Sequence, residues 1–453
     1  MVQASPLVRI ARATAGTEWE GDLYLVGGAV RDDLLGKEVE ADYDLVTTGD
    51  APALARFLWK QRVSEIPPVT YERFGTAMVR VEGTQVELVT ARKESYDPGS
   101  RKPKVERATL REDAERRDFT ANTLMRRITD GELIDSLGMG LIDLQAGILR
   151  TPLDPQATFA DDPLRMLRAV RFRWKLGFTP APGLYEAIRT ARERLRIVSP
   201  ERIRDEVVKM LGGKPEPVVG ALRDLMDLGL IEIFAPALVP MVGCEQGDWH
   251  DSDVWDHTLR VVANAGSGDL ELTLAALLHD VGKPATRTIH EGHVRFFGHE
   301  KVGAEMTREI LRDLRFPQRD IEKVAGLVRN HMRLGSGPFT EAAARRLIRD
   351  MGDDTDRLLH LVDADANALR AGVRALELGP IRETVDRVRA ATPADRLESP
   401  LDGREIAARL GIAPGPEVGR YKTALQEAVL EGRLLPGDKE RALELLAELA
   451  PGL

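Results

Sequence analysis

The strongest constraint on the fold is a change of pattern near residue 160 of the 453-residue chain. Before it, short apolar or alternating runs such as Leu23–Val26, Asp42–Thr47 and Thr84–Thr90 are typical of β-strands. Beyond Asp162, apolar residues recur at helical spacing up to Leu449, and strand patterns nearly vanish. The sequence therefore predicts an α+β chain, in which a small mixed-sheet head precedes an elongated all-α part.

The length of the chain predicts several domains, since a single core rarely extends over so many residues. We expect a head over residues 22–148 and a neck of helices over 149–216. A helical connector over 217–250 then leads to a body over 251–370, and a C-terminal helical tail covers 390–453.

The overall charge gives no sign of a nucleic-acid partner, because the formal net charge is -9. The stretch from Asp161 to Lys214 differs, with 13 Lys or Arg against 7 Asp or Glu, a local balance of +6 that can attract a polyanion. Cys244 is the only cysteine, which excludes an internal disulfide and a cysteine-rich zinc site. Without an apolar run near the ~18 residues of a membrane span, and without a leader pattern, we expect a cytoplasmic protein that contacts no membrane.

Two acidic residues in the predicted head have the spacing of metal ligands. Asp42 and Asp44 are two apart on one predicted strand, so their side chains face the same side. Carboxylates so placed can share the paired divalent ions that catalyse phosphoryl transfer. The alternative is an exposed edge strand with capping aspartates. Glu87, on a later strand, is either a third carboxylate or base, or a residue that faces water.

A glycine turn and several arginines supply possible phosphate contacts. Gly27 and Gly28 lie where a strand gives way to a helix, which lets backbone N–H groups approach a phosphate. Arg31 follows on that helix, and the pair Arg116-Arg117 comes later in the head. A plain tight turn and a helix start with surface charges are the alternative interpretations.

The start of the neck suggests a way to select a nucleobase. Cytosine and adenine each present an amine beside a ring-nitrogen acceptor, whereas guanine and uracil present the reverse order, so one carboxylate and one arginine match only the first two. With a helix opening at Asp162, Asp162 and Arg165 would lie at i and i+3 on one face. The alternative is a helix N-cap and an ordinary ion pair. Arg165, Arg168 and Arg171 recur every third residue and form a positive stripe.

Five motifs, in this order and spacing, resemble those of class II tRNA nucleotidyltransferases (CCA-adding enzymes) and bacterial poly(A) polymerases. The fifth begins with Asp161 where the family usually has Glu. The motifs are Gly27-Gly28-Ala29-Val30-Arg31-Asp32, Asp42-x-Asp44, Arg116-Arg117-Asp118-Phe119-Thr120, the stretch Asp135–Leu144, and Asp161-Asp162-Pro163-Leu164-Arg165.

The resemblance implies a nucleotidyltransferase head that adds CCA to the 3′ end of tRNA from CTP and ATP, with release of pyrophosphate. It implies that Asp42 and Asp44 hold Mg²⁺ and that Asp162 and Arg165 read the base. The implied nucleotide contacts are Gly28, Arg31, Arg117, Arg168 and Arg171. No obligate protein partner is implied.

Histidines concentrate in the predicted body. Four of the eight in the chain, together with aspartates, form a set of ligands suited to borderline divalent metals. The pattern resembles the HD phosphohydrolase superfamily, which implies a site for Mg²⁺, Mn²⁺ or Ni²⁺. Asp363 is an alternative to Asp365, because the sequence leaves the helix phase open. The implied first metal set is His257, His279, Asp280 and Asp365, and the residues for a second metal are His299 and His331.

Other functions compete with CCA addition. Within the family, the alternatives are A-only or CC-only addition, or poly(A) synthesis. The segment Tyr96–Glu112 resembles the flexible loop that CC-adding enzymes lack, which argues against CC-only addition. An HD phosphohydrolase with a degenerate head is a second alternative, and a non-enzymatic RNA-binding module is a third.

Overall fold

The computed structural model describes residues 5–38, 43–95, 104–247, 252–334, 338–369, 376–391 and 397–450. The chain forms two compact units. Unit 1 comprises Met1–Met210 with Arg223–Ile233, and unit 2 comprises Leu211–Leu222 with Phe234–Leu453. No helix in the described ranges has the length and apolar character to cross a membrane.

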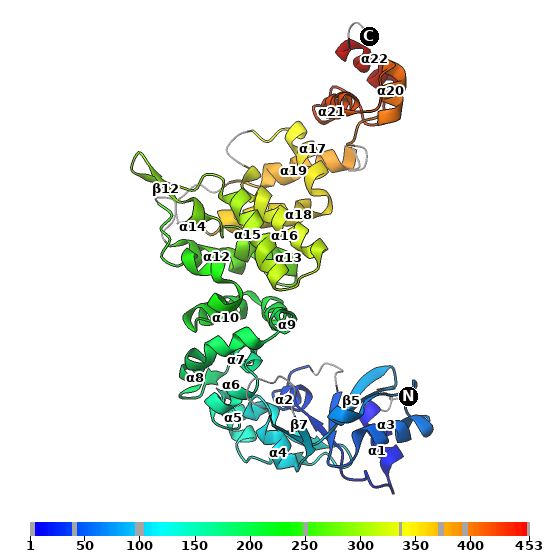
Figure 1. Ribbon diagram of the computed structural model, residues 1–453, viewed down its shortest axis with the longest axis vertical. Coiled ribbons are helices and arrows are strands. Elements are labelled where there is room, and N and C mark those ends of the chain that lie inside the picture. Colours follow the sequence, from blue (N-terminus) through cyan, green and yellow to red (C-terminus); the bar gives the residue numbers. More distant parts are fainter. Residues whose placement is uncertain are drawn as a thin grey trace. The chain divides into compact units, whose positions relative to one another are not determined.

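Unit 1 begins with a seven-stranded mixed sheet, which confirms the fold class predicted for the head (Figure 1). The strand order is β3-β4-β5-β2-β1-β8-β9; β2 and β5 run parallel, and the other neighbours run antiparallel. The strands are β1 (Tyr24–Val26), β2 (Tyr43–Thr47), β3 (Val69–Tyr71), β4 (Thr76–Val81), β5 (Thr84–Thr90), β8 (Met125–Arg127) and β9 (Leu133–Ile134).

Helices and a hairpin flank this sheet. Helix α3 packs against β4 and β5, and its Leu54 and Leu58 are fully buried there, each worth about 1.5–3 kcal/mol of apolar burial. The helices are α1 (Pro6–Thr14), α2 (Gly28–Leu34), α3 (Ala51–Lys60), α4 (Leu110–Glu115) and α5 (Gly140–Ala146); the hairpin is β6 (Arg92–Ser95) with β7 (Lys104–Arg107).

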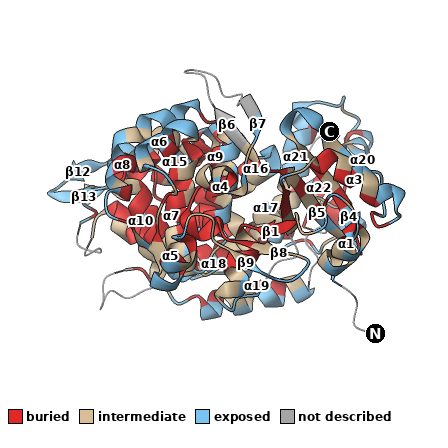
Figure 2. Ribbon diagram, turned by 90° about the horizontal axis from the view of Figure 1, so that it is seen from below, coloured by how far each residue is buried: buried red, intermediate tan, exposed pale blue. Residues whose placement is uncertain are grey.

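Helices make up most of the rest of unit 1, as predicted, beside a short parallel pair of β10 (Ile148–Leu149) and β11 (Thr179–Pro180). In α7, buried residues recur at helical spacing, and Figure 2 shows this burial in α7 and in strand β1. Asp224 binds three donors around α7: its Oδ2 accepts from Trp174 Nε1 at 2.7 Å, and from Arg173 and Tyr185. The helices are α6 (Pro155–Asp161), α7 (Leu164–Leu176), α8 (Leu184–Ala191) and α9 (Pro200–Leu211); α10 (Pro215–Asp227) contributes to both units.

Unit 2 is helical around a buried central helix. Every residue of α13 from Leu272 to Leu278 is buried, because α12, α16 and α18 pack around it. These helices are α12 (Val254–Ala265), α13 (Leu270–Leu278), α14 (Lys283–Thr286), α15 (His299–Asp313), α16 (Gln318–Asn330), α17 (Glu341–Met351), α18 (Thr355–Ala366) and α19 (Gly379–Ala391), followed by α20 (Gly403–Leu410), α21 (Pro416–Leu430) and α22 (Lys439–Leu449).

Besides β11, two features differ from the pattern expected beyond residue 160. A short hairpin of β12 (Thr288–His290) and β13 (His293–Arg295) interrupts the helices of unit 2. Its turn residues Glu291 and Gly292 both have positive φ, at 50° and 80°, the conformation of a tight hairpin turn. The second difference concerns Asp162, which lies before α7 rather than on it.

Candidate functional site

The turn after β1 brings Asp44 and Arg117 close together. Gly27 has φ 75° and ψ -136°, which L side chains rarely adopt, and α2 begins at the next residue. A Cβ atom on Gly27 would lie 3.9 Å from both Arg117 Nη1 and Asp44 Oδ2. The glycine therefore leaves space beside a carboxylate oxygen and a guanidinium nitrogen that belong to different elements.

The sheet also fixes the relation between Asp44 and Glu87. They are Cα partners on the parallel strands β2 and β5, so their side chains lie on the same face, and both are half-buried. Asp42 lies outside the described residues, because β2 is described from Tyr43 onward. Its pairing with Asp44 stays a prediction.

Three of the arginines predicted to contact the nucleotide surround Phe172, a buried residue of α7. The guanidinium carbons of Arg31, Arg168 and Arg171 lie 5.1, 5.3 and 4.3 Å from the centre of its ring. The electron-rich face of an aromatic ring attracts such cations. Sequence reasoning did not single out Phe172, although it lies among the arginines of the positive stripe.

Buried acidic side chains hold these arginines in place. Asp118 accepts hydrogen bonds from Arg168, with Nε at 2.9 Å, and from Asn122. Glu206, on α9, pairs with Arg171 at 2.7 Å and lies 3.5 Å from Arg168. Arg171 is therefore buried against a carboxylate. The sequence had predicted a positive stripe that includes Arg171, but not this carboxylate partner.

The neighbouring positive charge keeps Asp118 ionised. Burial opposes ionisation of Asp118, but the Arg168 guanidinium and the Asn122 amide more than compensate and lower the pKa of Asp118. Burial alone would lower the pKa of Arg168, but the negative charge of Asp118 has the larger effect and raises it. Asp118 and Glu206 thus form charged pairs with the predicted nucleotide-contacting arginines.

The prediction that Asp162 and Arg165 lie on one helix face is wrong. Helix α6 ends at Asp161, Asp162 has extended φ and ψ of -135° and 99°, and α7 begins at Leu164, so the i and i+3 relation does not apply. Asp162 Oδ1 accepts a hydrogen bond from Leu164 N at 3.1 Å, and its Oδ2 accepts one from Arg202 at 2.9 Å.

Arg165 does not pair with Asp162 in this structure. Its guanidinium donates to the backbone carbonyl oxygens of Arg116 and, at 3.5 Å, of Thr158. The alternative of an ordinary ion pair between Asp162 and Arg165 is therefore also wrong. Both side chains remain half-buried at the junction of α6 and α7.

Unit 2 contains the histidine cluster that the sequence predicted. Two groups of three residues offer ligand atoms that lie within 4.8 Å of one another: His257, His279 and Asp365, and Asp280, His299 and His331. Asp280 connects the groups. Its Oδ2 lies 3.1 Å from His279 Nε2, and its Oδ1 lies 3.4 Å from His299 Nε2.

The imidazole rings are oriented for metal binding. The Nδ1 atoms of His279, His299 and His331 lie 2.8, 2.8 and 2.7 Å from backbone carbonyl oxygens, which only accept hydrogen bonds, so each Nδ1 carries the proton. In the neutral imidazole, which is the form that binds a metal, each Nε2 would then be a lone-pair donor directed into the cluster, an arrangement that commonly supports histidine ligands. The donor set of imidazole and carboxylate fits a divalent metal.

The electrostatics of the cluster reflect the burial of its histidines and of Asp280. Although burial opposes ionisation, the charges of His279 and Lys283 keep the pKa of Asp280 well below its usual value. Burial, with the nearby charges of His279 and His299, lowers the pKa of His331 to about 4. His331 is therefore neutral near pH 7, as a metal ligand must be.

The structure also settles which aspartate joins the histidines. Asp365 Oδ1 lies 2.9 Å from His257 Nε2, whereas Asp363 approaches Asn367 and, at 3.8 Å, Arg382. Lys283 was not predicted, although it stands three residues after Asp280 on the sequence. This buried lysine lies 2.6 Å from Asp280 Oδ2 and donates to Gln246 Oε1 at 2.7 Å.

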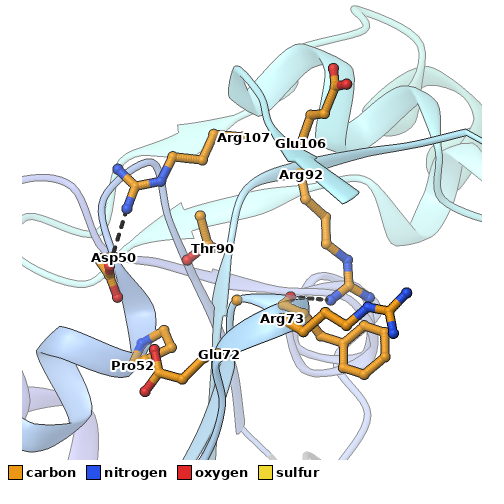
Figure 3. Close-up of a pocket in the computed structure, with 10 residues that line it drawn as sticks. Asp50, Pro52, Glu72, Arg73, Thr90, Arg92, Glu106 and Arg107 are labelled. Carbon is orange, nitrogen blue, oxygen red and sulfur yellow. Dashed lines mark hydrogen bonds and ion pairs between the residues drawn. The ribbon is translucent and has the colours of Figure 1, made fainter. Parts of the chain in front are cut away.

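A pocket of about 130 Å³ opens at the other end of the head sheet from Asp44 (Figure 3). Arg107 pairs with Asp50 at 3.1 Å across it, and Arg92 donates to the Phe74 carbonyl oxygen at 2.8 Å. Its three arginines and three acidic residues balance in charge, which does not favour a polyanion. Its lining is Asp50, Pro52, Glu72, Arg73, Phe74, Gly75, Thr90, Arg92, Glu106 and Arg107.

Comparison with known families agrees with this geometry. Residues 23–150 match the poly A polymerase head domain, and residues 254–369 match the HD domain. Residues 177–241 match the probable RNA and SrmB-binding site of polymerase A. The class of protein is thus a nucleotidyltransferase with a poly(A) polymerase-type head and an HD domain.

Similarity over the full length gives the family. The chain is 36% identical to the A-adding tRNA nucleotidyltransferase of Deinococcus radiodurans, covering 94% of this chain and 96% of that protein. It is 35% identical to the CC-adding tRNA nucleotidyltransferase of Thermus thermophilus, covering 94% and 93%. The chain belongs to the tRNA nucleotidyltransferase family.

A solved structure supports the same assignment. The CCA-adding enzyme of Bacillus stearothermophilus, in complex with CTP, superposes with a TM-score of 0.71 at 26% identity and 98% coverage of both chains. The predicted combination of a mixed-sheet head and helical regions is therefore confirmed.

Proposed function

We propose that this chain adds CCA to the 3′ end of tRNA, using CTP and ATP and releasing pyrophosphate. The observation that carries the proposal is the meeting of Asp44, the Gly27 turn and Arg117 at one end of the central strands β1 and β2. The similarity to a CCA-adding enzyme bound to CTP, over nearly the whole of both chains, supports it independently.

In the proposed mechanism, Asp42 and Asp44 hold Mg²⁺, with Glu87 beside Asp44 on the same face. When bound, Mg²⁺ activates the attacking 3′-hydroxyl and stabilises negative charge on the transferring phosphoryl group. Gly28, at the N-terminus of α2, offers a backbone N–H to a phosphate. Arg117 and the arginines around Phe172 neutralise the triphosphate, whose charge grows on the leaving pyrophosphate.

Base selection is proposed for Asp162 and Arg165, although they do not share a helix face. Asp162 offers a carboxylate acceptor for the exocyclic amine of cytosine or adenine, and Arg165 offers donors for the neighbouring ring nitrogen. Their present contacts with Arg202 and with backbone carbonyl oxygens must give way or be shared when a base binds. No nucleic-acid template takes part in this selection.

Partial addition is the main alternative, because the relatives named A-adding and CC-adding are almost equally similar to this chain. The loop expected over Tyr96–Glu112 bears on this choice, but its first part lies outside the described residues. The poly(A), degenerate-head and RNA-binding alternatives receive less support.

A single assay tests these alternatives. Purified protein is incubated with tRNA transcripts ending before CCA, or after CC, and with labelled CTP, ATP, GTP or UTP one at a time and CTP plus ATP together. CCA addition predicts that CTP extends the first transcript by two residues and ATP extends the second by one. Use of only one substrate identifies a partial enzyme, and long A tracts identify a poly(A) polymerase. No incorporation with any transcript would refute the proposal.

A second activity is proposed for the HD domain, on the strength of its buried ligand cluster. With Mg²⁺, Mn²⁺ or Ni²⁺ bound, the cluster would hydrolyse phosphate esters at RNA ends. The test is release of phosphate from a 2′- or 3′-phosphorylated oligonucleotide, or opening of a 2′,3′-cyclic phosphate, with each metal in turn. Release that persists in the double variant His279→Ala/Asp280→Ala would assign the activity elsewhere.

A further inference from the structure

Asp113, on α4, is an acidic residue to which neither the sequence patterns nor the proposed mechanism gave a role. Its side chain is completely buried and binds two arginines that are adjacent in sequence. Oδ1 accepts from Arg116 Nε at 2.9 Å and Nη2 at 2.6 Å, and Oδ2 accepts from Arg117 Nε at 3.1 Å and Nη2 at 2.9 Å. Each carboxylate oxygen therefore holds one guanidinium group at two points.

The binding of Arg117 through Nε and Nη2 determines where its remaining nitrogen points. A guanidinium group is planar, so two contacts to one oxygen fix its orientation. Nη1 is the atom that lies 3.9 Å from the position of a Cβ on Gly27, as does Asp44 Oδ2. Asp113 thus directs Nη1 of Arg117 toward the turn where the proposed function places the triphosphate.

The backbone ties Asp113 to a second element. Arg92 N, at the start of β6, approaches Asp113 Oδ1 at 3.4 Å, and α4 packs against this strand. The arginine pair compensates the burial of the carboxylate: although burial opposes ionisation, Arg117 and Arg116 lower the pKa of Asp113. A buried carboxylate that is charged near neutral pH therefore lies behind the two arginines.

We propose that Asp113 is a positioning residue for nucleotide binding, which acts by holding Arg117 with Nη1 directed at the incoming triphosphate. This inference rests on the proposed function, because it needs a triphosphate at the Gly27 turn. Asp113 itself contacts no substrate. Its effect should therefore appear in the KM for the nucleotide more than in the KM for tRNA.

The experiment compares Asp113→Asn, Asp113→Glu, Arg117→Ala and the double variant Asp113→Asn/Arg117→Ala, using CTP or ATP with the matching tRNA transcript. Asp113→Asn removes the charge at nearly constant size, and we expect the nucleotide KM to rise about tenfold or more, as for loss of a charge-assisted contact. Asp113→Glu keeps the charge, and its KM should lie between those of the wild type and Asp113→Asn. In the Arg117→Ala background, Asp113→Asn should add less than about twofold, because its effect passes through Arg117.

The matched control is Asp22→Asn, in the loop before β1 of the same head. Asp22 Oδ2 accepts four hydrogen bonds at the opposite end of β2, including Thr47 Oγ1 at 2.8 Å and Thr48 N at 2.9 Å, so its loss also weakens the head. We expect this variant to lower the melting temperature with the nucleotide KM within about twofold of wild type.

The possible failures are distinguishable. A wild-type protein that incorporates no nucleotide refutes the proposed function. An active wild type with an unchanged KM in Asp113→Asn refutes only the inference, as does an equal rise in KM for Asp22→Asn at equal loss of stability. Should Asp113→Asn fail to fold, Asp113→Glu decides, because it keeps the charge: a nucleotide KM for Asp113→Glu no higher than that of wild type also contradicts the inference.

Discussion

The candidate sites of the two units are organised in opposite ways. In the histidine cluster of unit 2, each of His279, His299 and His331 donates to the carbonyl oxygen three residues before it, so the rings are oriented locally. In the head, orientation depends on distant partners: Arg168 binds Asp118, 50 residues away, and Arg31 binds Asn122, 91 residues away. In the first site the ring orientations need only local helical structure, although the packing of the helices still brings the rings together. In the second site the orientation of the arginines itself depends on the folding of the unit.

The largest expected effect separates the two sites completely. Asp44→Asn removes a proposed Mg²⁺ ligand from β2, and nucleotide incorporation should fall at least about 10³-fold with the fold intact, because metal-assisted transfer depends on that charge. Gel analysis of labelled tRNA measures the loss. Phosphate-ester hydrolysis in the same preparation should stay within twofold. Near-normal incorporation would refute the metal assignment.

The converse change removes the centre of the histidine cluster. His279→Ala/Asp280→Ala takes one residue from each ligand group, and metal-dependent hydrolysis should fall at least about 100-fold. Bound metal, measured on the dialysed protein, should fall with it. Incorporation should stay within about threefold of wild type. A parallel loss of incorporation would show that the two sites are coupled.

Lowering the pH should destabilise the histidine cluster of unit 2 through protonation of His331. The folded pKa of His331 is about 4, below the usual value of ~6.5, so its contribution is full above pH ~6.5 and is lost as the pH falls toward 4. The free energy of unfolding should therefore fall by up to about 3 kcal/mol. Hydrogen exchange over α12, α13 and α16 in the presence of a chelator should show it in the wild type and not in His331→Gln. The same change in hydrogen exchange with pH in the wild type and in His331→Gln would contradict this account.

A smaller effect concerns nucleotide choice. Asp162→Ala removes the proposed base-reading acceptor, and preference for C and A over G and U should fall about tenfold, the cost of one lost charge-assisted hydrogen bond. Competition between labelled nucleotides measures the preference. Arg202→Ala, which leaves the carboxylate in place, is the informative comparison. An unchanged preference in Asp162→Ala would remove the base-reading role.

The smallest effect tests which aspartate serves the histidines. Asp363→Ala should leave hydrolysis and bound metal within about twofold, because its side chain points to Asn367 and Arg382. Asp365→Ala should lose most of both, since Asp365 contacts His257. An equal loss of hydrolysis and of bound metal in the two variants would contradict the assignment of Asp365 to the cluster.

The same contrast explains what the sequence could predict. Alternating residues predicted β5 at its observed bounds, because strand periodicity is a local property. The cluster was predicted from its residue types and from the resemblance to the HD superfamily, in which the adjacent pair His279-Asp280 is a local feature of the sequence. Asp365 could not be separated from Asp363, because the phase of α18 depends on how that helix packs.

The predictions that failed depend on tertiary structure. Asp162 was placed on α7, but Pro163 separates it from that helix and α6 ends just before it. The ion pair of Arg171 with Glu206 joins residues 35 apart, and no local pattern reports it.

Asp113 lies three and four residues before its arginines, a helical spacing that was visible in the sequence.

Asp280 has a consequence for how cations would fill the HD domain. One negative side chain serves two neighbouring ligand groups, with Oδ2 toward His279 and Oδ1 toward His299. A first cation would draw on that shared charge and repel a second one nearby, so loading would be anticooperative. Titration with a divalent cation would then show one cation bound tightly per chain and a second bound with lower affinity. The metal concentration in the cell would decide whether one or two cations are bound.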